Sequence, residues 1–219
     1  MSVTSYFGET DIADLKNGQL EMQHEQSNLS ENLSIKTFQR VRNKLKQFTG
    51  LDLNHFDHLP PMLLSTLIGS QLINAGGSSM DELLWKYAED KGLAVEGLES
   101  FAEQMDIYQQ IPMDYQILQL KKMLLNLSKA RKSLEVLVDL YQRQEIHKLY
   151  RVSRKSLGPI RKLMLEQRNR IIADRIFDQL KVNTDRRCFF TVGAAHMAGE
   201  HGILHMLNEM GVKITPCKV

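Results

Sequence analysis

The chain has 219 residues, of which 42% are hydrophobic, 25% charged and 7% aromatic. This is the composition of a globular protein, and it excludes collagen-like and low-complexity chains. The length predicts one domain over residues 1–219 with a core of its own. A mean hydropathy of -0.31 and the lack of a long apolar run predict that no segment spans a membrane.

The net charge of +2 conceals an uneven distribution. Residues 1–120 hold 8 Lys/Arg and 17 Asp/Glu, whereas residues 121–219 hold 20 and 9. A nucleic-acid-binding protein can have such a basic half. Here the basic residues are spread along predicted helices without aromatic side chains between them, so we interpret them as basic helices beside acidic ones. We therefore expect no nucleic-acid partner.

Cysteines and the first residues bear on the compartment. Cys188 opens one predicted strand and Cys217 closes the next, so in a parallel sheet the two sulfurs are too far apart for a disulfide. The first residues lack the basic and then apolar pattern of a signal peptide. As written, the sequence predicts a cytoplasmic protein.

Predicted elements follow one another with a clear order of types. Alternation and β-branched content predict strands, while apolar residues three and four apart predict helices. The predicted strands are 3–10, 93–98, 188–192 and 212–215. The predicted helices are 33–48, 61–73, 79–92, a short one ending near 109, 114–141, 160–180 and 199–210. Residues 11–31 are polar and predict loop.

This order predicts a helix-rich α/β fold. A small parallel or mixed sheet would carry a large helical insertion, because residues 33–183 are mostly helical with one strand near 93–98. Gly50 and Gly211 stand where helix C-termini are expected, and Pro60-Pro61 stands at a helix start.

The strongest local signal for a site is Gly193-Ala194-Ala195-His196, directly after an apolar strand. Ligands of open α/β sheets bind beyond the carboxyl ends of strands. Gly193 would allow a sharp exit from the strand, and His196 can be a metal ligand or a general base there. A histidine that only caps the next helix is the alternative. His201 and His205 lack the carboxylate of a zincin motif, so we interpret them as surface or packing residues.

Two carboxylates also follow predicted strands. Glu9 ends the first strand and Glu99 follows the second. If the strands are parallel, both carboxylates and His196 would meet at one rim, and together they could hold a metal or perform acid–base chemistry. The alternative for each carboxylate is a structural role, because a negative charge near a helix N-terminus stabilises the helix.

A polar pair, Arg168-Asn169, interrupts an apolar stripe of the helix predicted over 160–180. Buried polar groups need partners, so the pair is expected to bind Glu9, Glu99 or an anionic group of a substrate. The alternative is a boundary position with an arginine that reaches solvent.

Taken together, four segments resemble motifs of the TraB/GumN family, which includes the Tiki metalloproteases. These segments are Phe7-Gly8-Glu9-Thr10-Asp11, Gly97-Leu98-Glu99-Ser100, Glu166-Gln167-Arg168-Asn169 and the stretch from Phe190 to Leu204. They occur in the family's order and span nearly the whole chain.

The resemblance implies the α/β fold shared by the haem-binding ChaN and the erythromycin esterases. It implies a metal-dependent hydrolase acting on a peptide or small-molecule substrate, with a divalent metal held by His196 and Glu9. His196, Glu9 and Arg168 would be catalytic, and Gly193, Glu99 and Asn169 would take part in binding. Arg168 would steady a carboxylate or a developing oxyanion.

One departure from the family pattern is expected to matter. The family has a first Gly-x-x-His motif before the strand of Glu9, and the eight residues before Glu9 contain no histidine. The sequence therefore reads as lacking that N-terminal segment, which could also have carried an export signal to the periplasm or cell envelope.

Two alternatives to the hydrolase remain open. A ChaN-type protein could hold haem or another apolar ligand, and the eleven methionines and seven histidines make axial ligation conceivable. A catalytically dead interaction domain is the second alternative, and the missing histidine motif favours it.

Overall fold

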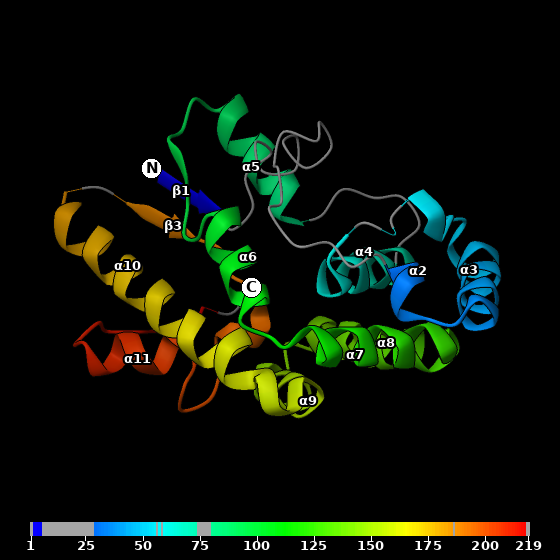
Figure 1. The fold of residues 1–219 in the computed structure, drawn as a ribbon. Coiled ribbons are helices and arrows are strands. Elements are labelled where there is room, and N and C mark those ends of the chain that lie inside the picture. The colour runs from blue at the N-terminus through cyan, green and yellow to red at the C-terminus, as the bar shows by residue number, and fades with distance from the viewer. Residues whose placement is uncertain are drawn as a thin grey trace. The chain divides into compact units, whose positions relative to one another are not determined.

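A computed structural model describes residues 2–5, 29–55, 57, 59–73, 80–185 and 187–217. These residues are mainly helical (Figure 1), which confirms the helix-rich prediction. They cluster into two compact units. Unit 1 takes in the described residues within Met1–Leu20, Ser78–Ile107 and Asp139–Val219, and unit 2 those within Glu21–Gly77 and Tyr108–Val138.

Three short parallel strands lie in unit 1. They are β1 (Ser2–Ser5), β2 (Val95–Gly97) and β3 (Cys188–Phe190), in the order β2-β1-β3. Val3 pairs with Val95 on one side and with Phe189 on the other. Because all three strands run in the same direction, the segments that follow β2 and β3 leave from one rim.

Most of the other described residues of unit 1 are helical. The helices are α5 (Met80–Asp90), α6 (Phe101–Gln109), the end of α8 (Leu127–Gln142), α9 (Ile146–Leu157), η2 (Gly158–Ile160), the π-helical η3 (Lys162–Gln167), α10 (Arg168–Val182), η4 (Ala194–His196) and α11 (Ile203–Glu209). α10 lies beside α11 (Figure 1), and the two bury one apolar cluster. Its buried members are Leu98, Ile172, Ala173, Ile176, Ile203, Met206 and Leu207.

Unit 2 is helical in its described part. It contains α2 (Leu29–Asn32), α3 (Ile35–Thr49), η1 (Leu53–His55), α4 (Pro61–Ile73), α7 (Met113–Leu125) and most of α8. Leu64 and Ile68 of α4 and Leu120 and Leu124 of α7 are fully buried together. α3 ends at Gly50, whose φ of 75° is the left-handed cap that its glycine predicts.

Three predicted elements need correction. The helix predicted over 114–141 is two helices, because Asn126 leaves the helical conformation and its N–H donates to Met123. The helix predicted from Gly199 begins only at Ile203. The strand predicted over 212–215 is wrong: residues 212–217, all described, form no strand, since the Val212 N–H donates back to the Leu207 carbonyl at the end of α11.

Several predictions fall on residues outside the described ranges. Glu9 and the remainder of the first predicted strand belong to them, as do the turn at 74–77 and the cap at Ser79. Cys188 and Cys217 are both free thiols, although the strand that Cys217 was expected to close does not form. None of the described helices is both long and apolar enough to cross a membrane.

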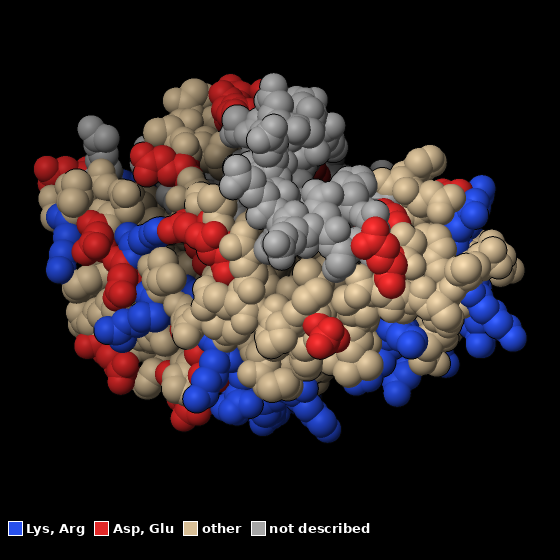
Figure 2. All heavy atoms as spheres, viewed as in Figure 1, with Lys and Arg blue, Asp and Glu red and all other residues tan. Residues whose placement is uncertain are grey.

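Charged side chains of both signs share the surface of unit 1. Arg170 pairs with Asp174 on α10 at 3.5 Å, and His205 faces Glu209 on α11 at 3.4 Å. Figure 2 shows acidic and basic side chains interspersed over these two helices. The basic excess of the second half is therefore partly neutralised by neighbouring carboxylates along the same helices.

Core packing of unit 2 gives a first prediction. Leu120→Ala removes a side chain with 0% exposure from the contact between α4 and α7. We expect a loss of about 2–5 kcal/mol in the free energy of unfolding, measured by urea denaturation followed by circular dichroism. Leu118→Ala, on the same helix with 46% exposure, is the control and should cost under about 1 kcal/mol. Equal losses would contradict this core assignment.

Candidate functional site

The candidate site lies in unit 1, at the rim where the parallel strands end. Glu99 follows β2 by two residues, and His196 lies in the turn η4 after β3. The sequence predicted this shared rim from the order of elements. Glu9, the third group expected there, is outside the described residues, so its position stays a prediction.

Arg168, the first residue of α10, binds Glu99 in a buried ion pair. Its Nη2 donates to Glu99 Oε2 at 2.9 Å, and its Nε lies 3.2 and 3.3 Å from the two carboxylate oxygens. The two side chains are only 9% and 1% exposed. Of the carboxylates proposed as partners from the sequence, Glu99 is the one that the structure pairs with Arg168.

Burial shifts the pKa values of both members of this pair toward their neutral forms. It raises the pKa of the Glu99 carboxyl from 4.5 to about 7; the charge of Glu103 adds to this rise and that of Arg175 opposes it. Burial also lowers the pKa of Arg168 to about 10, which still leaves the guanidinium charged at neutral pH. Each charged group therefore needs the other, and removing one would leave a poorly solvated charge.

Asn169, the next residue of α10, joins the pair to the histidine. It is fully buried, and its Nδ2 donates to the His201 carbonyl at 2.6 Å. That bond turns its Oδ1 toward His196, whose Nδ1 lies 2.6 Å away. Because an amide oxygen only accepts, His196 Nδ1 must donate, and the imidazole carries its proton there.

The environment also sets the charge of His196. Burial, helped by the nearby Arg168 charge, lowers its pKa to about 3. The ring is therefore neutral at physiological pH, with its lone pair on Nε2. A neutral imidazole whose Nδ1–H is held by a hydrogen bond is the form in which histidines ligate metals or accept protons.

The turn that presents His196 depends on two glycines. Gly199 has a φ of 90°, and a Cβ there would lie 2.3 Å from the Tyr150 ring. A Cβ on Gly202 would meet the Ala198 carbonyl oxygen at 2.3 Å. Gly193, by contrast, has φ -56° and ψ 134°, which any residue adopts, so the exit from the strand does not use the conformational freedom of glycine.

A π-helical turn precedes the Arg168-Asn169 pair. Residues Lys162–Gln167 form η3, directly after the Gly158-Pro159 break. The i→i+5 hydrogen bonds of a π-helical turn change which side chains of the following helix face the core. Such turns are frequent at functional sites. Leu165 within this turn and Asn169, Ile172 and Ile176 beyond it are all buried, and they form the stripe that the sequence spacing predicted.

Sequence reasoning missed a second arginine at this rim. Arg175, two turns along α10 from Arg168, donates to the Leu98 carbonyl at 2.5 Å and forms an ion pair with Glu103. This contact lowers the pKa of Glu103 to about 2. Ser100 and Glu103 cap each other at the start of α6. The spacing Ser-x-x-Glu signals such a cap, and it holds the segment after β2 in place.

A third contact fixes the other strand end. Thr191, directly after β3, donates its hydroxyl to Asp81 of α5 at 2.9 Å.

His201 and His205 lie near Glu200 and Glu209 and are substantially exposed, in agreement with their interpretation as surface residues. Among the described residues, no group of three or more His, Cys, Asp or Glu side chains could hold a metal.

Breaking the buried ion pair should destabilise the fold. Arg168→Met leaves Glu99 without its guanidinium partner, and we expect a loss of about 3–5 kcal/mol in the free energy of unfolding. The loss should be larger at pH 8 than at pH 5.5. Burial raises the pKa of Glu99, so protonation at lower pH relieves the unpaired charge in the variant, and this relief is lost as the pH rises.

The control for this change is Arg170→Met, which removes an exposed arginine from the same helix. It should cost under about 1 kcal/mol. Equal costs for the two variants, or a cost of Arg168→Met that does not depend on pH, would contradict the assignment.

Protonation of His196 should appear in the pH dependence of stability. Its pKa is lowered in the fold to about 3 from 6.5, so between these values the unfolded chain binds a proton that the folded chain does not. Stability from this group is therefore complete above about 6.5 and declines as the pH falls, by at most about 1.4 kcal/mol per unit. Comparing unfolding of wild type and His196→Gln from pH 7.5 to 5 should show a shallower slope for the variant. Parallel curves would refute the buried neutral form.

The similarity of this chain to known proteins lies at the level of the family. Neither the curated proteins nor the solved structures gave a match. A family model matches residues 6–216, which include all the site residues described above. The chain belongs to the TraB/PrgY/gumN family.

Proposed function

We propose that this chain is a metal-dependent hydrolase of the TraB/GumN type that cleaves peptides. The observation that carries the proposal is the state of His196: a neutral ring in the turn after β3, held through Nδ1 by Asn169. Family membership supports it, since the histidine stands in the segment that resembles the family's C-terminal motif. We also propose the ChaN and erythromycin esterase architecture for the fold, which the parallel strand order supports.

The donor chemistry of the site fits one metal ligand among the described residues. His196 would supply Nε2, and Glu9 would supply a carboxylate. Zinc and related divalent ions combine imidazole and carboxylate ligands of this kind. A metal bound there would polarise the substrate carbonyl or lower the pKa of a bound water.

The remaining side chains would prepare the site. Asn169 would keep the His196 ring in the required tautomer and orientation. Arg168 would place a positive charge beside a developing oxyanion, and Glu99 would hold that guanidinium in place through its three contacts. Glu99 and Asn169 are thus positioning residues in this proposal.

Metal binding by the purified full chain tests the proposal. We expect Co²⁺ in equilibrium dialysis and visible absorption spectroscopy to show a site that His196→Ala weakens at least tenfold. Asn169→Ala should weaken it about 10- to 100-fold, as is typical for removal of the partner of a metal-bound histidine. Peptide cleavage by the metal-loaded chain should be lost in His196→Ala and with a chelator.

His205→Ala is the matched control, because it removes an exposed histidine from the next helix of the same unit. It should leave both metal binding and cleavage unchanged. Metal affinity that is the same in His196→Ala and wild type would overturn the metal site, and cleavage that survives His196→Ala would overturn the hydrolase.

A further inference from the structure

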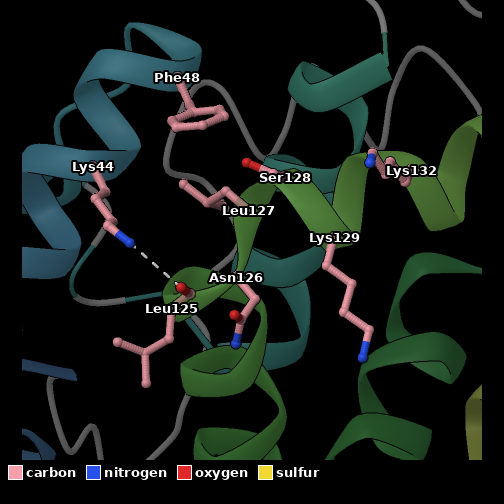
Figure 3. A pocket seen from close by; sticks show the side chains of 8 residues that line it. All are labelled: Lys44, Phe48, Leu125, Asn126, Leu127, Ser128, Lys129 and Lys132. Atoms are coloured by element: carbon pink, nitrogen blue, oxygen red, sulfur yellow. Dashed lines mark hydrogen bonds between the residues drawn. The ribbon is translucent and has the colours of Figure 1, made fainter.

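A second, separate site candidate lies in unit 2, at the corner between α7 and α8. A pocket of about 480 Å³ opens there (Figure 3). Its walls come from α3, the corner at Asn126 and the first two turns of α8. The lining residues are Lys44, Phe48, Leu125, Asn126, Leu127, Ser128, Lys129 and Lys132. A volume of this size is in the range of pockets that hold small molecules.

The pocket is strongly basic. Three of its eight lining residues are lysines, and none is acidic. In the described part of the chain, no carboxylate forms an ion pair with Lys44, Lys129 or Lys132, whereas neighbouring Arg131 pairs with Glu135. Lys44 makes only a long contact, 3.5 Å, with the Leu125 carbonyl. Three lysines thus line one cavity without a carboxylate among the lining residues.

This arrangement opposes the local electrostatics of the helix. α8 begins at Leu127, has no acidic residue in its first turn and carries Lys129 there. The N-terminal turn of a helix has a partial positive charge, so lysines near it are unfavourable. Proteins place such unfavourable charges mainly where a function requires them. No acidic residue in the first turn of α8 offsets the charge of Lys129. An anion in the pocket would supply the compensation.

One side of the pocket is apolar. The Phe48 ring is 46% exposed and lies near the side chain of Leu127, with the Ser128 hydroxyl at the same side (Figure 3). Phe48 and Lys44 are one turn apart on α3, so the apolar wall and a positive charge adjoin. A ligand that uses both needs an anionic group and a planar or apolar body.

We propose that this pocket binds a phosphate monoester carried on an aromatic or apolar body. The phosphate lies near Lys129 and Lys132, and the body packs on Phe48. A phosphate monoester carries about 1.5 to 2 negative charges at pH 7, which suits several lysines without carboxylates better than a single carboxylate would. The site is independent of the metal-dependent hydrolase proposed for unit 1.

Isothermal titration calorimetry of the full chain with phenyl phosphate tests this proposal. We expect binding that weakens as KCl is raised, since Lys129 and Lys132 are exposed. Inorganic phosphate should bind more weakly than phenyl phosphate, and phenol should not bind. Phe48→Ala should weaken phenyl phosphate at least threefold and leave inorganic phosphate unchanged.

Paired variants separate this site from general charge effects. Lys129→Met with Lys132→Met should weaken phenyl phosphate at least tenfold. Lys36→Met with Arg40→Met removes the same charge from exposed positions of α3 outside the pocket and should change the affinity less than twofold. Thermal unfolding of each variant verifies its fold, and Lys132→Met alone is the fallback variant.

Vesicles distinguish the two sources of a phosphate monoester. Phosphatidic acid vesicles that displace phenyl phosphate identify a lipid headgroup as the ligand, and vesicles that do not displace it identify a soluble ester. Either result supports the pocket. Equal affinities in the two paired variants, or no binding of phenyl phosphate at millimolar concentration, would overturn it. His196→Ala should leave the binding of phenyl phosphate unchanged. The test of the pocket is therefore independent of the test of the proposed hydrolase.

Discussion

The buried ion pair between Arg168 and Glu99 is the constraint on which the candidate site depends. Two charged groups leave water here, and only their mutual contacts offset that cost. Glu99 is fixed by its place two residues beyond β2, so Arg168 must reach the rim from α10. The position and phase of α10 against the strands are therefore set by electrostatics as well as by the apolar stripe of Ile172 and Ile176.

Asn169 extends this constraint to the histidine. It follows Arg168 directly, so whatever fixes the first turn of α10 also fixes the amide. The amide in turn bridges the His196 ring at the end of η4 and the His201 carbonyl in the segment after it. Gly199 and Gly202 let that turn pack closely against Tyr150 and its own backbone. The adjacent residues Arg168 and Asn169 thus connect Glu99, after β2, to His196, after β3.

Much of this arrangement follows from the sequence. Apolar spacing predicted most helices and glycine predicted the end of α3. The polar pair inside an apolar stripe gave a buried Arg168 with a carboxylate partner as one of two interpretations. A sequence can predict such a pair because a buried charge requires a partner of opposite charge. The order of elements likewise predicted that Glu99 and His196 share a rim.

The rest depends on tertiary contacts that local patterns do not encode. Asn126 ends α7 in the middle of an unbroken apolar period, and nothing in the spacing marks it. Val212 and Ile214 alternate like a strand, yet the backbone bond to Leu207 turns the chain back onto α11. Arg175 looked like one more member of a helix face. Its partner, Glu103, is 72 residues away, and only the fold shows that they meet.

Charge balance connects the ion pair to the proposed metal. Burial that lowers the pKa of His196 removes competition from protons, which favours metal ligation, but it also makes a dication costly to bring in. Arg168 adds to that cost, because its charge acts on the same ring. Glu99 neutralises this guanidinium through the buried ion pair. The carboxylate of the ion pair, together with an anionic ligand such as Glu9, is therefore what would allow a buried neutral imidazole to serve a cation.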